Sequence, residues 1–547
     1  MKRVIAVAAT AGLTLLGLTA GSAADAAPAA KAGVAWQKCP DKGETAGFAA
    51  AGVLCGSLSV PLDYAKPHGK HITLALSLFR HDPKVPYQGV MLTNPGGPGG
   101  SGLNLALYLP SAVPNNGGAG YDWIGFDPRG IGNSRPALVC NPNYFNSPRP
   151  DYVPSSKAIL TKWLARSKSY ATDCKANDKI GLLSHDKTTD SVADMESIRK
   201  ATGQQQINYY GFSYGTYLGQ VYASLHPDRV RRMVLDSNVD PRGVWYKANL
   251  DQDVAFDANI NRWFAWIASY NSFFKLGTSE AAVRKVWYGE LNALRKKPVS
   301  GVVLGTTHKV GIGPDEWTDI FTQAAYYRST WLTTANNPLG LGNVFADFIH
   351  HVAGANNQLA TLYSPNLGAG NDNLFAGYNA VQCTDVQWPT SWAKWQRDNS
   401  ALYKTHPFLT WSNVWFNAPC LYWPAKAGVP TKVTGGKVPP ILLIDETNDA
   451  ATPYKGSVYV RSIFPNSRLL AEPGGGTHAD SLFGDTCVDG AVSAYLASGA
   501  LPARTGTAGY GADMICAPLS DPVPGAASAR IQAPSLLGHV NALLPRR

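Results

Sequence analysis

Three features are scarce in this chain of 547 residues, and each scarcity excludes a class of protein. Charged residues make up only 16% of the sequence, and the basic ones are scattered apart from short runs such as that at 295–297. A nucleic-acid surface needs clustered basic residues, so the net charge of +10 does not indicate one. Beyond the N-terminal segment no run of about 18 apolar residues occurs, which argues against a membrane span. C-x-x-C and H-E-x-x-H motifs are also missing, so we expect neither a metal nor another cofactor.

The first 26 residues have the layout of a secretory signal peptide. Lys2 and Arg3 precede an apolar stretch, rich in Ala and Leu, from Val4 to about Ala20, and small residues in the A-x-A pattern follow. This stretch is too short for a spanning helix and has the wrong flanks. We therefore expect cleavage near Ala26 and a secreted, extracellular protein, with a short pro-segment left open.

The eight cysteines fit an exported chain, in which an even number indicates disulfide bonds. Pairing each cysteine with its neighbour in the sequence closes the shortest loops, and nothing indicates a longer crossing. The sequence therefore predicts the pairs Cys39–Cys55, Cys140–Cys174, Cys383–Cys420 and Cys487–Cys516.

Strand-like and helix-like segments alternate in two blocks of the chain. Residues 35–90 predict antiparallel strands, after which buried strands, glycine-containing turns and helices follow one another. This βαβ order predicts an α/β fold with a mostly parallel sheet and helices on both faces. Residues 244–430 are rich in Trp, Tyr, Phe and Asn and mainly helical in pattern. We therefore expect a core in two parts, 27–243 and 431–547, that carries an inserted helical cap at 244–430.

Residues 211–215, GFSYG, fit the G-x-S-x-G pattern. The pattern alone is common and also describes an ordinary tight turn. Between a strand and a helix, where the sequence places it, it predicts a nucleophile elbow that holds Ser213 on a strained turn above the sheet. Gly211 and Gly215 flank the serine because a side chain at either position would collide with the neighbouring strand or helix.

A serine hydroxyl needs a histidine to accept its proton, and the histidine needs an acid to orient it. In this class of fold the serine comes first in the chain, then the acid, then the histidine. The histidines after residue 430 are His478, in a glycine-rich loop after a predicted strand, and His539, near the C-terminus. We expect His478 to be the base, because the last strand of such a sheet delivers it.

The acid should follow the preceding strand, and Asp445, Glu446 and Asp449 all stand there. We favour Asp449, because the acid must reach past the end of the strand to meet the histidine. Asp445 could instead be a carboxylate that closes the loop or caps a helix.

Acyl transfer also needs hydrogen-bond donors for the negatively charged oxygen of the intermediate. The backbone N–H of Tyr214, the residue after the nucleophile, is one expected donor. The second should come from the glycine-rich segment NPGGPGGSG at 94–102, and we expect the N–H of Gly97. A phosphate-binding loop is the competing interpretation, but the segment has neither G-x-G-x-x-G spacing nor a G-K-[ST] ending.

Five motifs, namely NPGGPGGSG, FDPRGIGNS, YYGFSYGTYLG, LDSNVDP and DAATP with GGTH, together resemble the α/β-hydrolase aminopeptidases. They are most similar to the secreted bacterial tripeptidyl aminopeptidases, relatives of prolyl iminopeptidase, from about residue 50 to residue 520. The resemblance implies a serine exopeptidase that releases short peptides, often tripeptides, from free peptide or protein N-termini. It carries the nucleophile onto Ser213, the acid onto Asp449 and the base onto His478. Asn94 stands where prolyl iminopeptidases usually have a histidine, which counts against release of single prolines.

An exopeptidase of this kind must hold a protonated α-amine, which carboxylates in a partly dry pocket do best. The cap contains Asp315, Glu316, Asp319 and Asp385, and each of them could equally be solvated or part of an ordinary ion pair. Asp385 is the first candidate, because it lies two residues from Cys383 and a disulfide could hold it in place.

Two other functions stay open at this point. A secreted esterase or lipase would use the same triad, since the order of residues does not separate ester from amide chemistry. A hydrolase fold used only for binding would normally have lost the serine, the histidine or the acid. The sequence leaves the oligomeric state open.

Overall fold

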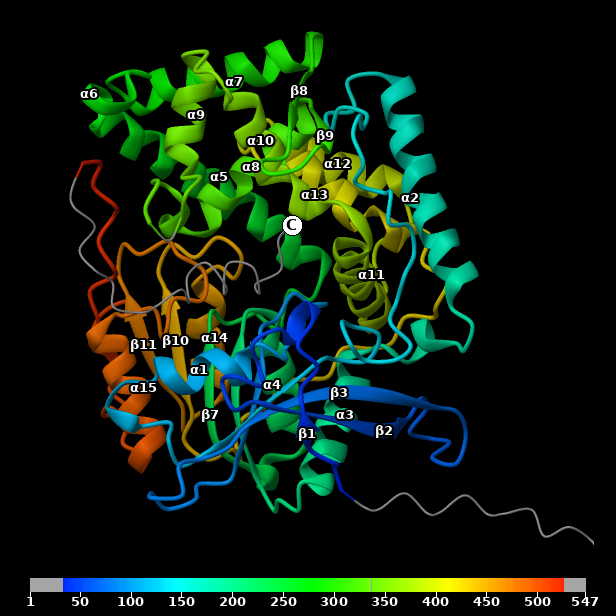
Figure 1. The fold of residues 1–547 in the computed structure, drawn as a ribbon, viewed down its shortest axis with the longest axis vertical. Helices are drawn as coiled ribbons and strands as arrows, with labels where there is room; N and C mark the ends of the chain where they lie inside the picture. Colours follow the sequence, from blue (N-terminus) through cyan, green and yellow to red (C-terminus); the bar gives the residue numbers. More distant parts are fainter. Residues whose placement is uncertain (1–32, 336, 526–547) are drawn as a thin grey trace, which may run out of the picture.

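The computed structural model describes residues 33–335 and 337–525, so the expected signal peptide at 1–26 and His539 lie outside the described residues. A single large sheet runs through the molecule in the strand order β1-β2-β3-β5-β4-β6-β7-β10-β11-β12 (Figure 1). Its strands are β1 (Gln37–Lys38), β2 (Leu54–Pro61), β3 (His71–Phe79), β4 (Val90–Asn94), β5 (Asp122–Phe126), β6 (Ile207–Phe212), β7 (Val230–Asp236), β10 (Leu442–Glu446), β11 (Arg468–Glu472) and β12 (Met514–Ile515).

The sheet is antiparallel among its first strands, β1 to β3 with β5, and parallel among the others. β2 pairs antiparallel with β1 and β3, and β3 pairs antiparallel with β5. Every neighbouring pair from β5 to β12 is parallel. The predicted antiparallel beginning and mostly parallel sheet are therefore confirmed.

Helices cover both faces of the sheet. Residues of α1 (Leu105–Ala112) and α15 (Thr486–Ser498) pack into one apolar core, and residues of α3 (Thr188–Ala201), α4 (Tyr214–Leu225) and α14 (Lys455–Ile463) pack into a second. Successive residues of a strand point to opposite faces, so Tyr210 belongs to the first core and Tyr209 to the second. Because both faces are buried, the central strands read as continuous apolar runs rather than alternating patterns.

Most of the remaining helices lie between residues 244 and 430, and Figure 1 shows them gathered above the sheet. They are α5 (Tyr246–Ser269), α6 (Asn271–Phe274), α7 (Glu280–Lys296), α8 (Pro314–Tyr326), α9 (Leu341–Ile349), α10 (Ala355–Tyr363), α11 (Gly368–Asp385), α12 (Trp392–Tyr403) and α13 (Thr410–Asn417). A small antiparallel pair, β8 (Val299–Val302) and β9 (Lys309–Ile312), interrupts them and was not anticipated from the sequence. Within 33–335 and 337–525, every helix falls short of the length and apolar character that a bilayer crossing needs.

One helix that precedes residue 244 in the sequence packs with the helices of residues 244–430. α2 (Lys157–Asn177) stands beside α11 and α13 in Figure 1. Its Trp163 stacks on Trp415 of α13 with ring centroids 5.4 Å apart and an interplanar angle of 9°. The indole N–H of Trp415 donates a hydrogen bond of 2.7 Å to the backbone oxygen of Tyr152. The layer above the sheet is therefore built from residues around 145–177 as well as from 244–430.

All eight cysteines form disulfide bonds, and the four predicted pairs are confirmed: Cys39–Cys55, Cys140–Cys174, Cys383–Cys420 and Cys487–Cys516. The last of these joins the beginning of α15 to the residue that follows β12. The third joins α11 to the turn after α13, so it closes part of the helical layer.

Candidate active site

Ser213 lies on the turn between β6 and α4. Its backbone has φ 55° and ψ −125°, a region that residues with a side chain rarely adopt. The surrounding backbone holds this conformation, because the Ser213 N–H donates to the Asp236 backbone oxygen at 3.0 Å. The Thr216 hydroxyl donates to the Ser213 backbone oxygen at 2.6 Å. This strained turn between a strand and a helix has the geometry of a nucleophile elbow.

Close backbone approach explains the glycines around the serine. A Cβ on Gly211 would lie 2.6 Å from the backbone oxygen of Gly215, and one on Gly215 would lie 2.7 Å from that of Asn94. A Cβ on Gly96, whose φ is 94°, would lie 2.9 Å from the Tyr214 nitrogen. The expected collisions at Gly211 and Gly215 are therefore confirmed, and the glycine-rich loop after β4 packs directly against the elbow.

Asp449 and His478 meet in the loops that follow β10 and β11. The distance between His478 Nδ1 and Asp449 Oδ2 is 2.7 Å, and the two residues are 3% and 2% exposed. Asp449 Oδ2 also accepts from the Thr452 hydroxyl at 3.0 Å. Its Oδ1 accepts from the backbone N–H groups of Ala451 at 2.8 Å and Thr452 at 3.0 Å. The carboxylate is thus fixed by four hydrogen bonds and leaves Nε2 as the ring nitrogen of His478 that can act as a base.

The end of β7 holds the histidine loop in place. Ser237 Oγ accepts from the Ala479 N–H at 2.7 Å, and Asp236 Oδ2 accepts from the Ser481 N–H at 2.9 Å. Burial raises the pKa of Asp236 to about 6, although the hydrogen bonds from Ser481 oppose that shift. These two residues belong to the LDSNVDP motif, whose sequence alone does not indicate this role.

The other two acids near the end of β10 face elsewhere. Asp445 Oδ2 accepts from the hydroxyl of Ser457 in α14 at 2.6 Å, and its Oδ1 has no hydrogen-bond partner among the described residues. Burial and the nearby Asp449 raise the pKa of Asp445 well above its usual range. Glu446 Oε2 accepts from the backbone N–H of Thr477. Of the three candidates considered, only Asp449 contacts the imidazole of His478.

A small pocket brings the expected residues together. Gly97, Ser213 and His478 line it, and so do residues from the helical layer and neighbouring loops: Gln252, Tyr326, Tyr327, Leu374, Tyr378, Phe416 and Ala451. The Tyr214 side chain points elsewhere, since its hydroxyl lies 2.9 Å from Thr188 Oγ1. What Tyr214 can offer to the pocket is therefore its backbone N–H.

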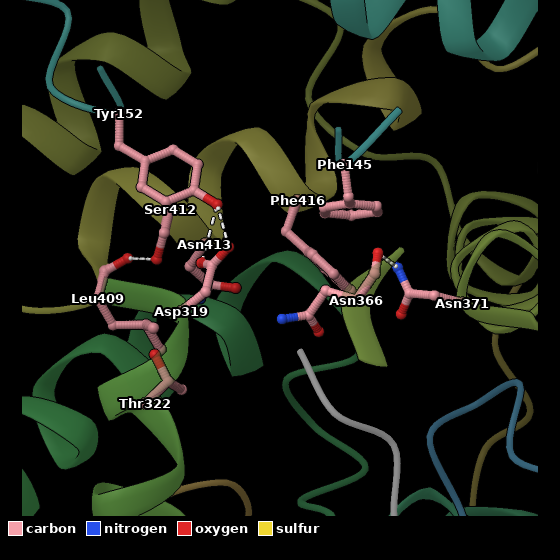
Figure 2. Close-up of a pocket in the computed structure, with 10 residues that line it drawn as sticks. All are labelled: Phe145, Tyr152, Asp319, Thr322, Asn366, Asn371, Leu409, Ser412, Asn413 and Phe416. Atoms are coloured by element: carbon pink, nitrogen blue, oxygen red, sulfur yellow. Dashed lines mark hydrogen bonds between the residues drawn. The ribbon is translucent and has the colours of Figure 1, made fainter. Parts of the chain in front are cut away.

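A second pocket adjoins the first, because Phe416 lines both. Figure 2 shows Asp319 of α8 facing Tyr152 in this second pocket, with Asn366 and Asn371 on its other side. The Tyr152 hydroxyl lies 2.9 Å from Asp319 Oδ1, and Arg149 Nη2 lies 2.7 Å from Asp319 Oδ2. Burial raises the pKa of Asp319, and the Arg149 guanidinium counteracts this.

The acids around Arg149 outnumber it. The guanidinium also contacts Glu316 Oε1 at 3.0 Å, and buried Asp315 lies next to them in the same helix. Asp315 Oδ1 accepts from the Tyr152 N–H at 2.7 Å, and Glu316 Oε2 accepts from the Gly313 N–H at 2.8 Å. The guanidinium therefore pairs with two of these three carboxyl groups, and Asp319 is the one that lines the pocket.

Asp385, the first candidate for the amine contact, is already engaged. Its Oδ1 accepts from the Thr188 N–H at 2.7 Å, and its Oδ2 accepts from the Thr188 hydroxyl at 2.6 Å and from the Trp245 indole at 3.1 Å. Burial raises its pKa to about 6. Asp385 thus joins the beginning of α3 to Trp245, and it lines neither of the two pockets, which argues against its contact with a substrate amine.

Comparison with known proteins agrees with the fold. The model of the alpha/beta hydrolase fold family matches residues 89–484. A tripeptidyl aminopeptidase of Streptomyces coelicolor is 40% identical over 517 residues, which cover 92% of this chain and 90% of that protein. The serine protease Hip1 of Mycobacterium tuberculosis is 30% identical over 82% of this chain and 86% of its own length. A carboxylesterase B of the same organism is 29% identical over 82% of this chain and 85% of its own length. The chain therefore belongs to the α/β-hydrolase fold family of serine hydrolases, together with the Streptomyces tripeptidyl aminopeptidases.

Proposed function

We propose that this chain is a secreted serine exopeptidase that releases short peptides, most simply tripeptides, from free N-termini. The observation that carries the proposal is the single pocket lined by Ser213, His478 and Gly97, in which the imidazole is held by Asp449. The tripeptidyl aminopeptidase of Streptomyces coelicolor, similar over 92% of the chain, supports the same class of substrate.

In the proposed mechanism Ser213 Oγ attacks the carbonyl carbon of the scissile peptide bond while His478 Nε2 takes its proton. Asp449 keeps the proton of His478 on Nδ1 and stabilises the imidazolium that forms. The backbone N–H groups of Gly97 and Tyr214 stabilise the oxyanion. The intermediate collapses to an acyl-enzyme as the imidazolium protonates the leaving amine. Water then attacks the acyl-enzyme, with His478 as base, and frees the released peptide.

The neighbouring pocket suits the positively charged end of the substrate. Asp319 lines it, and the group of Asp315, Glu316 and Asp319 contains two more carboxyl groups than guanidinium groups. We propose that the substrate's α-ammonium group binds against Asp319, because a charge-assisted contact in a partly dry pocket is stronger than one in water. With the substrate amine in this pocket and the scissile carbonyl at Ser213, the separation of the two pockets sets the length of the released peptide.

Mass spectrometry of a peptide ladder tests this function. Peptides of four to ten residues with free N-termini should each lose fragments of the same length, whereas their N-acetylated counterparts should stay intact. Ser213→Ala protein is the control for a contaminating peptidase. Cleavage inside the acetylated peptides would indicate an endopeptidase, and turnover confined to ester substrates would indicate an esterase.

A further inference from the structure

A second group of side chains, distinct from the triad, converges beside it. Glu446, Glu472 and Asp480 each place one carboxylate oxygen within 4.8 Å of the others. The three residues are 2%, 0% and 5% exposed. Glu446 and Glu472 are the last residues of β10 and β11 and stand opposite each other in the parallel register. Asp480 follows His478 by two residues.

Three of the carboxylate oxygens in this group lack, among the described residues, the hydrogen-bond partners that buried charges need. Neither oxygen of Glu472 has a hydrogen-bond partner in the described part of the chain, and the same holds for Asp480 Oδ2. None of the three acids forms an ion pair with a described Lys, Arg or His residue. The guanidinium of Arg328 is the positive charge that acts on Glu446, but it hydrogen-bonds to Gly474 and Asp521 instead.

Such an arrangement is unfavourable without a counter-charge. Burying an unpaired carboxylate is strongly unfavourable, and like charges opposite each other in a sheet repel. Burial, reinforced by Asp480 and Asp236, raises the pKa of Glu472 to about 10. At neutral pH the cluster must therefore either hold protons or bind a cation.

We propose that Glu446, Glu472 and Asp480 bind a divalent cation of the calcium type. Three carboxylates and no nitrogen or sulfur ligand form a hard donor set, which calcium prefers and zinc does not. The three carboxylate oxygens all lie within 4.8 Å of one another, close enough to ligate one ion, and calcium tolerates irregular geometry where magnesium demands a near-ideal octahedron. Water or backbone carbonyl oxygens would complete the six to eight ligands that calcium takes, in roughly that range.

The cation would brace the two loops of the triad. The backbone oxygen of Glu446 accepts from the Asp449 N–H at 3.1 Å, and its side chain accepts from the N–H of Thr477, the residue before His478. Asp480 belongs to the same loop as His478. A cation that joins the three carboxylates therefore holds the acid loop and the base loop together at the ends of β10 and β11, without touching the reacting atoms.

Calcium binding to the full mature protein tests the proposal. After dialysis against EDTA and then against metal-free buffer at pH 7.5, added calcium should bind at one ion per chain by isothermal titration calorimetry. It should raise the Tm by at least about 2 °C, since a ligand that binds only the folded state stabilises it. Magnesium should give a smaller rise at the same concentration.

Two variants locate the ion. Glu472→Gln removes a ligand charge with little change of shape and should abolish both the heat of binding and the Tm rise. Asp445→Asn is the matched control, because Asp445 is buried in β10 beside Glu446 but hydrogen-bonds to Ser457 of α14, and it should keep both. If Glu472→Gln does not fold, Asp480→Asn and the calcium content of the purified wild type by mass spectrometry replace it.

Two results would overturn the proposal. Absence of binding at millimolar calcium would mean that the cluster holds protons instead of a metal. Undiminished binding in Glu472→Gln or Asp480→Asn would place the ion elsewhere. Neither result depends on peptidase activity, so the outcome is independent of the proposed function.

Discussion

Replacing Asp449 by asparagine separates the proposed acid from its neighbour Asp445. In the wild type, Asp449 Oδ1 accepts two backbone N–H groups, and Oδ2 accepts the Thr452 hydroxyl and the proton on His478 Nδ1. An asparagine has only one acceptor oxygen, which the two backbone N–H groups require. Its NH2 group must then face His478 Nδ1, so that nitrogen becomes an acceptor and the ring proton moves to Nε2.

A His478 ring with its proton on Nε2 cannot accept the proton of Ser213. The same tautomer problem in a serine protease triad lowers the rate by about 10⁴, or about 5 kcal/mol of transition-state stabilisation. We therefore expect Asp449→Asn to lose about four decades in kcat while the protein stays folded. Asp445→Asn should lose less than about tenfold, because the Asp445 carboxyl hydrogen-bonds to Ser457 of α14 and not to His478.

Both variants are measured with a tripeptide p-nitroanilide, with the Tm and the circular dichroism spectrum as controls for folding. The reasoning is refuted if Asp449→Asn keeps its kcat within tenfold of the wild type. A loss in Asp445→Asn as large as that in Asp449→Asn would move the acid to Asp445.

Three further expectations concern the nucleophile, a disulfide and a buried acid. Ser213→Ala should lose several orders of magnitude in rate with an unchanged Tm, and turnover within tenfold of the wild type would exclude Ser213 as nucleophile. Replacing both Cys383 and Cys420 by alanine should lower the free energy of unfolding by about 2–5 kcal/mol in urea titrations, and an unchanged midpoint would contradict a structural role. Folding raises the pKa of Asp385 from 3.8 to about 6. Asp385 therefore stabilises the folded state fully below pH 3.8, and this contribution is lost as the pH rises through about 6. Asp385→Asn should therefore flatten the fall in the free energy of unfolding between those pH values, and an unchanged slope would show that other groups cause it.

The parts of the fold that the sequence predicted are those with local signals. The elbow at 211–215 combines a strand, a tight glycine-flanked turn and a helix, and short backbone contacts make that pattern necessary. The pairing of neighbouring cysteines was predicted correctly because each disulfide closes a short loop, with its two cysteines 16 to 37 positions apart in the sequence. Asp449 is favoured over Asp445 and Glu446 both by the need to reach past the strand end and by the resemblance to the aminopeptidases.

The parts that were not predicted depend on contacts between distant segments. Trp163 of α2 packs on Trp415, 252 positions later in the sequence, and no local sequence pattern predicts that contact. Asp385 lies near a disulfide, as expected, but its oxygens are used by Thr188 and Trp245. Glu446 and Glu472 look like ordinary strand-end acids in the sequence, and only the register of β10 and β11 places them side by side.

The central claim, cleavage from a free and protonated N-terminus, is tested by comparing a tripeptide amide reporter with its N-acetylated twin. A charge-assisted contact of about 1.5–3 kcal/mol predicts that kcat/KM is about 10–100 times higher for the free amine. Asp319→Asn should remove most of that preference. Asp228→Asn, which changes a carboxylate that is 70% exposed, should leave it intact. Equal kcat/KM for the free and acetylated reporters in the wild type would contradict the exopeptidase account.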